Sequence, residues 1–111
     1  MKYYPVFMDI KGRHCLVVGA GPVGLRKART LARCGARVTV VSRDIPPVAD
    51  RPGAETIAWE NRDYRPDDLE RNFLVFAATD NAGLNRQISR EAERKGILCN
   101  IADAPDTSDF I

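Results

Sequence analysis

The chain has few of the residues that build metal and nucleophile sites. It contains one histidine, His14, and three cysteines, Cys15, Cys34 and Cys99, with no two of them in a C-x-x-C pair. Zinc sites use closely spaced cysteines with histidine partners, so we expect no bound metal. An odd number of scattered cysteines favours free thiols, buried or half-buried in a protein of the reducing cytoplasm, over a disulfide framework.

An excess of either charge is also missing. Lysine and arginine number 17 against 15 acidic residues, a net charge of +2, and no basic block is interleaved with aromatic residues. This balance argues against a nucleic-acid-binding surface. No stretch approaches the roughly 20 apolar residues of a membrane span, and residues 1–12 lack the apolar core and cleavage site of a secretory signal. We therefore expect a cytoplasmic protein with neither nucleic acid nor membrane as a partner.

The apolar residues follow an alternating pattern along one domain of 111 residues, 44% of them hydrophobic. Short β-branched runs predict strands at residues 14–18, 37–41, 55–59, 72–78 and 97–101. Helical spacing predicts helices at 22–33 and from a cap at 81 to 95, one helical turn within 65–71, and a proline-rich surface connection at 45–53. This alternation predicts an α/β fold: a Rossmann-like, doubly wound parallel sheet of about five strands with helices on both faces.

A glycine-rich turn between the first strand and helix carries the strongest chemical signal. In "CLVVGAGPVGLRKA", Gly19, Gly21 and Gly24 have the G-x-G-x-x-G spacing, and Pro22 and Val23 lie inside the motif. In dinucleotide-binding proteins the first glycine permits the tight turn, the second lets the backbone approach a pyrophosphate, and the third allows close helix–strand packing. The helix N-terminus adds about half a positive charge. The alternative, a structural turn that binds nothing, is less favoured because both flanking elements fit.

The residues that would meet the adenosine ribose leave two interpretations open. NAD-binding domains often place an acidic residue about 20 residues past the turn, where this chain has Ser42, Arg43 and Asp44. Ser42 and Arg43 suit the 2′-phosphate of NADP. Alternatively, Ser42 hydrogen-bonds an unphosphorylated ribose while Arg43 stacks or faces solvent.

A basic cluster, Arg26, Lys27 and Arg29, lies on the helix just past the turn. Such a cluster is usually a solvated helix face. In a functional interpretation, one or two of these cations would meet the anionic cofactor or an acidic substrate.

Three segments together resemble the N-terminal domain of siroheme synthases, a family that includes stand-alone precorrin-2 dehydrogenases. The segments are "YPVFMDIKGRHCLVVGAGPVGLRKARTLARCGARVTVVS", "FLVFAATDNAGLN" and "CNIADAPDTSDFI". The resemblance implies NAD-dependent oxidation of precorrin-2 to sirohydrochlorin, with sirohydrochlorin ferrochelatase activity in some members. It also implies a homodimer at full length. The family's dimerising and substrate-closing region would follow residue 111, so we expect this chain alone to bind NAD weakly and to turn over little precorrin-2.

The same resemblance assigns roles to individual residues. Ser42 matches a position near the adenosine ribose, and Thr79 and Asp80 match a segment that borders the cofactor. Asp103 matches the aspartate that the family is thought to use as general base. A carboxylate that is partly desolvated beside a nicotinamide can have its pKa raised and accept a proton. From the residues alone, the favoured role for Asp103 is to cap a turn that Pro105 fixes, and the favoured role for Asp80 is a helix N-cap.

Two other kinds of protein share the glycine turn. One is a regulatory NAD(H)-sensing Rossmann module, such as those attached to potassium transporters, which usually has an acidic residue where Ser42 stands and does not need the "NIADAP" segment. The other is a different NAD(P)-dependent dehydrogenase, which only the substrate would distinguish. A domain that keeps the fold without the cofactor is a further alternative.

Overall fold

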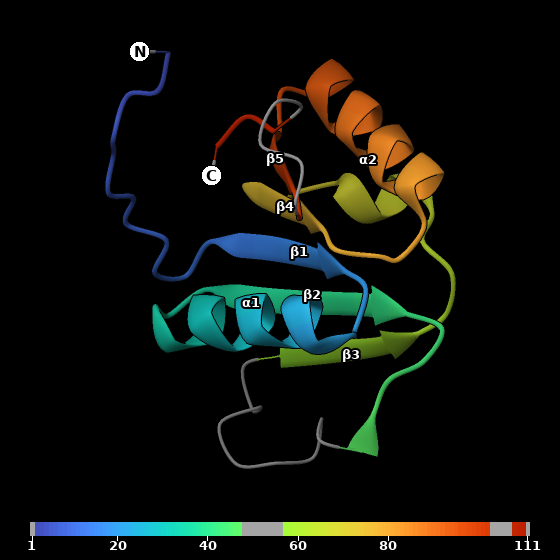
Figure 1. The fold of residues 1–111 in the computed structure, drawn as a ribbon. Helices are drawn as coiled ribbons and strands as arrows, with labels where there is room; N and C mark the ends of the chain where they lie inside the picture. Colours follow the sequence, from blue (N-terminus) through green and yellow to red (C-terminus); the bar gives the residue numbers. More distant parts are fainter. Residues whose placement is uncertain (1, 48–56, 103–107, 111) are drawn as a thin grey trace.

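A five-stranded parallel sheet forms the centre of the computed structural model, which describes residues 2–47, 57–102 and 108–110 (Figure 1). The strand order is β3-β2-β1-β4-β5. The elements are β1 (His14–Val18), α1 (Pro22–Arg33), β2 (Arg37–Ser42), β3 (Ile57–Asn61), the 3₁₀ helix η2 (Pro66–Leu69), β4 (Leu74–Ala77), α2 (Ala82–Arg94) and β5 (Leu98–Ile101). The predicted doubly wound α/β fold is confirmed.

The direction of winding reverses beside β1. The chain builds β2 and β3 on one side of β1, then returns through η2 to place β4 and β5 on the other side. Val18, at the end of β1, therefore pairs with Val41 of β2 and with Ala77 of β4. In parallel sheets this reversal leaves a crevice at the carboxyl ends of the strands, where ligands bind.

Each face of the sheet has its own apolar core because side chains alternate along a strand. Cys15 and Val17 of β1 point to the α1 side, whereas Leu16 and Val18 point to the α2 side. The helices contribute buried stripes at helical spacing, which are Ala28 and Leu31 from α1 and Ile88 and Ala92 from α2. No helix among the described residues is long and apolar enough to cross a membrane.

The predicted elements differ from the observed ones mainly at their ends. Both helices and β1 begin and end within about one residue of their predicted limits. The predicted third strand, 55–59, is displaced, because β3 runs Ile57–Asn61 and residues 55 and 56 lie outside the described part. Most of the predicted 45–53 connection also lies outside it. Two buried free thiols are confirmed at Cys15 and Cys99, but the expectation for Cys34 is wrong because it is exposed just past α1.

An ion pair organises the connection from β3 to β4. The Arg62 guanidinium donates to both carboxylate oxygens of Asp68, at 2.6 and 2.9 Å, and the backbone N–H of Arg65 donates to the same carboxylate at 2.7 Å. The Asp68 side chain is 8% exposed. Burial raises the pKa of Asp68, but the hydrogen bonds from Arg62 and Arg65 outweigh burial, so its pKa is lowered.

We expect Asp68→Asn to lower the free energy of unfolding at pH 7 by about 1–3 kcal/mol, because it removes charge-assisted hydrogen bonds from a buried acceptor. A folded-state pKa below the unfolded value of about 3.9 contributes stability above that value, and the contribution is lost as pH falls through the folded-state pKa. The difference between wild type and variant should therefore narrow below about pH 4. Urea unfolding at several pH values measures it, with the exposed neighbour Asp67→Asn as a matched control. An unchanged difference at low pH would contradict the electrostatic explanation.

Candidate functional site

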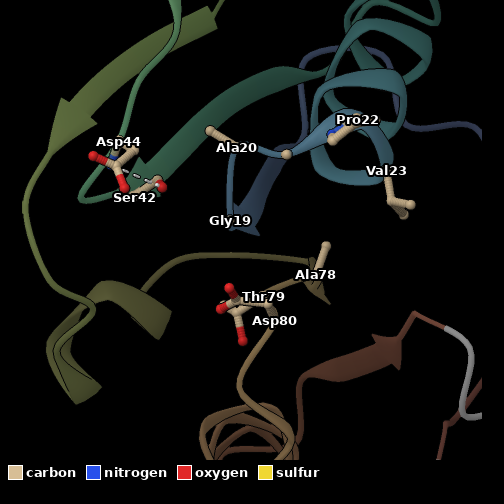
Figure 2. A pocket seen from close by; sticks show the side chains of 10 residues that line it. Gly19, Ala20, Pro22, Val23, Ser42, Asp44, Ala78, Thr79 and Asp80 are labelled. Carbon is tan, nitrogen blue, oxygen red and sulfur yellow. Dashed lines mark hydrogen bonds between the residues drawn. The ribbon is translucent and has the colours of Figure 1, made fainter.

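A cavity of about 480 Å³ opens at the carboxyl ends of β1, β2 and β4, where the winding reverses (Figure 2). Three segments line it: the glycine turn that leads from β1 into α1, the end of β2, and the residues that follow β4. The lining residues are Gly19, Ala20, Gly21, Pro22, Val23, Ser42, Asp44, Ala78, Thr79 and Asp80.

The glycines allow the backbone segments around the cavity to approach one another. Gly19 has φ +112°, a conformation that side-chain-bearing residues rarely adopt, and a Cβ there would lie 2.4 Å from the carbonyl oxygen of Ala78. A Cβ on Gly24 would lie 2.2 Å from the carbonyl oxygen of Gly19. Both contacts are with backbone atoms that cannot move aside cheaply. Gly19 therefore permits the tight turn and Gly24 permits close packing of the helix on the strand, as the spacing predicts.

The N-terminus of α1 has no side-chain cap. Gly21 is its N-cap residue and supplies no side-chain hydrogen bond, and the cavity lies against this end of the helix. The first N–H groups of a helix have no partner within the helix. At the start of α2, by contrast, the Asn81 side chain accepts from the N–H of Leu84 at 3.0 Å. A Cβ on Gly21 would meet nothing within 4 Å, so the space above the turn is open. This geometry fits the pyrophosphate of a dinucleotide.

Ser42 and Asp44 form the wall of the cavity at the end of β2. Their side chains lie beside each other, and the N–H of Asp44 donates to the Ser42 hydroxyl at 3.3 Å (Figure 2). Arg43 is not part of this wall, because its guanidinium forms a two-point ion pair with the exposed Asp63, with Nη2 to Oδ2 at 2.8 Å. The hydrogen bond with Asp63 raises the pKa of Arg43 and lowers the pKa of Asp63.

The wall after β4 is fixed by a buried amide. Asn85 of α2 accepts at its Oδ1 from the Thr79 hydroxyl (2.6 Å) and the Thr79 N–H (3.2 Å), and its Nδ2 donates to the Thr79 carbonyl at 3.1 Å. Thr79 is therefore held in place as the chain turns from β4 toward α2. Asp80 lies exposed beside it, and Asn81 is the N-cap. The N-cap of α2 is therefore Asn81 and not Asp80, for which this role was the alternative.

The structure brings together most of the predicted cofactor residues: Gly19, Gly21, Pro22, Val23, Ser42, Thr79 and Asp80. Gly24 packs behind the turn and Arg43 lies outside the lining, so a direct contact of either with a cofactor stays a prediction. Asp103 lies outside the described residues.

Sequence reasoning missed four residues of this region. Ala20 and Ala78 line the cavity through small, apolar groups that carry no chemical signal. The sequence places Asp44 at the end of the second strand but gives no signal that its carboxylate lines the cavity. Asn85 had a usable signal, because it is a polar residue three positions before Ile88 on the buried stripe of α2. Within the described ranges, no group of three His, Cys, Asp or Glu side chains is arranged to hold a metal ion.

Two solved structures have the same fold as this chain. SirC, a precorrin-2 dehydrogenase, superposes with a TM-score of 0.74 over 90% of this chain and 49% of its own, at 24% sequence identity. A short-chain dehydrogenase from Leptospira borgpetersenii with bound NAD⁺ superposes with a TM-score of 0.54 over 91% of this chain and 56% of its own, at 12% identity. At these identities the comparison shows the fold alone.

Comparison of sequences shows relatives of higher identity than the two structures. Over its whole length the chain is 42% identical to the siroheme synthases of Methylobacillus flagellatus and Nitrosomonas eutropha, and it spans 24% of the length of each. The profile of a protein family described as "Putative NAD(P)-binding" matches residues 6–111. The chain therefore belongs to this NAD(P)-binding family and is homologous to about a quarter of the siroheme synthase chain.

Proposed function

We propose that this chain is the NAD-binding part of a dehydrogenase that oxidises precorrin-2 to sirohydrochlorin in siroheme biosynthesis. The observation that carries the proposal is the cavity at the uncapped N-terminus of α1, in a chain 42% identical over its whole length to siroheme synthases. The fold shared with SirC supports it. The ferrochelatase activity and the homodimer of the full-length protein stay predictions from the family resemblance.

In this proposal, different lining residues bind different parts of the NAD molecule. The turn at Gly21 and the first N–H groups of α1 hold the pyrophosphate, which carries the negative charge that a helix N-terminus favours. Ser42 and Asp44 accept hydrogen bonds from the adenosine ribose. Thr79, fixed by Asn85, and Asp80 border the rest of the molecule. When NAD is bound, its nicotinamide ring accepts the hydride that leaves the substrate.

Oxidation of precorrin-2 also releases a proton, and we assign its removal to Asp103. This residue follows Ile101, the last residue of β5, and the carboxyl ends of parallel strands meet at the same edge of the sheet as the cavity. A carboxylate is a suitable base because its proton affinity rises where bound ligands exclude water.

The wall at the end of β2 favours NAD over NADP. The Asp44 carboxylate faces the cavity, where it would accept from the ribose hydroxyls and repel a 2′-phosphate. Arg43, the cation that would pair with this phosphate, is bound to Asp63 instead. Of the two interpretations that the sequence left open, these observations support NAD.

The first prediction concerns the glycine turn. Gly21→Ala should leave the fold intact, because Gly21 has φ −75° and its Cβ would meet no atom. It should weaken NAD binding about tenfold or more, because the methyl group stands between the helix N–H groups and the pyrophosphate and each charge-assisted hydrogen bond matters at that scale. Calorimetric titration measures the dissociation constant. Gly83→Ala, near the start of α2 and outside the cavity lining, is the control, and because its Cβ would lie 3.3 Å from Oδ1 of Asn81, the thermal unfolding of both variants is measured as well. If both variants bind NAD with the same dissociation constant, the proposal that the pyrophosphate binds at Gly21 is contradicted.

The second prediction concerns the choice between cofactors. Asp44→Asn should lower the ratio of the NADP to the NAD dissociation constant about tenfold, because it removes a like charge beside the 2′-phosphate. Asp63→Asn should lower the same ratio a few fold by releasing Arg43 from an exposed ion pair, which is weak by itself. Asp80→Asn removes a charge from the opposite wall and serves as the control. If neither Asp44→Asn nor Asp63→Asn changes the ratio of the NADP to the NAD dissociation constant, the proposal that this wall binds the adenosine ribose is refuted.

The third prediction concerns the base. In the full native polypeptide, Asp103→Asn should lower kcat for precorrin-2 by about 10²–10⁴-fold, the usual contribution of a general base. The NAD dissociation constant should be unchanged. Asp106→Asn, a neighbouring carboxylate in the same segment, should keep most of the activity. If both variants are as active as wild type, Asp103 is not the base, whereas NAD binding and the dehydrogenase assignment stand.

A further inference from the structure

A second cavity, of about 290 Å³, lies on the α1 face of the sheet and has no role in binding NAD as proposed above. Two cations from α1, Arg26 and Lys27, line it together with Leu31, two phenylalanines, Phe76 and Phe110, and the buried amide of Asn100. A charged rim over an aromatic floor is an unusual combination for a helix face that only meets solvent.

Neither cation has a carboxylate partner among the residues that the structure describes. Within the described part of the chain, neither Arg26 nor Lys27 has a carboxylate at ion-pair distance, and the cavity has no acidic lining residue. Lys27 is half-buried, and its Nζ lies 5.6 Å from the centroid of the Phe76 ring. Its positive charge is thus held over the aromatic floor and attracts an anion.

The floor is built by specific contacts. The rings of Phe76 and Phe110 meet edge to face, with centroids 5.3 Å apart and an interplanar angle of 86°. Asn100 is 7% exposed, and its Nδ2 donates to the carbonyl oxygen of Phe110 at 2.6 Å. The N–H of Asp109 donates to the carbonyl oxygen of Cys99 at 2.9 Å. These hydrogen bonds connect residues 109 and 110 to β5 and place the Phe110 side chain in the lining of the cavity.

The second cavity and the cofactor cavity lie beside the same two elements, α1 and β4. Val23 lines the cofactor cavity, and Lys27 lies four residues later on the same face of α1, about 6 Å along the helix axis. On β4, Phe76 stands two residues before Ala78, which lines the cofactor cavity. A ligand in the second cavity would therefore extend naturally toward a bound cofactor.

We propose that this second cavity receives one carboxylate-bearing edge of the tetrapyrrole substrate, with Lys27 and Arg26 binding its acidic side chains and Phe76 and Phe110 contacting the apolar ring. The inference rests on the proposed function. The substrate combines a large apolar ring system with carboxylate groups at its rim, which complements an aromatic floor with a cationic rim. The cavity is much smaller than a tetrapyrrole, so it holds an edge and leaves the ring to reach the cofactor.

The test uses the full native polypeptide and anaerobic titration with sirohydrochlorin, followed by absorbance. Lys27→Gln should raise the dissociation constant for sirohydrochlorin and the KM for precorrin-2 about tenfold, the scale of a charge-assisted hydrogen bond. Both kcat and the dissociation constant for NAD should stay near wild type. Lys27→Arg should recover most of the affinity. Arg33→Gln makes the same charge change in the last turn of α1, outside the cavity, and should have little effect.

The possible results separate the two proposals. If wild type binds sirohydrochlorin and Lys27→Gln binds it as tightly as Arg33→Gln does, the second cavity is not the substrate site, whereas the proposed dehydrogenase stands. If wild type binds NAD but neither binds sirohydrochlorin nor oxidises precorrin-2, both proposals fail. Unchanged thermal unfolding of the Lys27 variants shows that a loss of affinity does not come from misfolding.

Discussion

The close approach of backbone atoms around the glycine turn is the constraint on which the site depends. Gly24 packs on the carbonyl of Gly19, and Gly19 packs on the carbonyl of Ala78. These contacts bring the start of α1 against the sheet and set β4 beside the turn. They also fix the distance between the helix N-terminus and the wall at Thr79. A side chain at either glycine would separate the parts that form the cavity.

The helix α1 lines both cavities, so in the two proposals one rigid element would contact both cofactor and substrate. Its first turn lines the cofactor cavity, and its second turn supplies both cations of the second one. The basic residues of α1 were predicted either to be solvated or to meet an anion. Arg26 and Lys27 line a cavity, whereas the guanidinium of Arg29 has a buried nitrogen with no hydrogen-bond partner among the described residues. One sequence cluster thus contains residues in two different environments.

Sequence patterns predicted the fold well because each element carries its own signal. β1 has a continuous apolar run, α2 has a cap at Asn81 and a stripe at Ile88 and Ala92, and the turn has its glycines. The wall at the end of β2 could not be predicted in the same way. Asp44 lines the cavity, whereas Arg43 pairs with Asp63, which is 20 residues away and reaches Arg43 only in the folded chain. Asn100 and Phe110 likewise meet through tertiary contacts that no local pattern records.

The two helices begin in different ways, and the difference has a consequence for how this protein evolves. Asn81 closes the start of α2, whereas Gly21 leaves the start of α1 open. A serine or aspartate at position 21 would stabilise α1 by about 1 kcal/mol through an N-cap hydrogen bond. In the proposed function, the same side chain would occupy the N–H groups that meet the pyrophosphate. A substitution that stabilises the helix at position 21 would then weaken binding, which is a trade-off between stability and function.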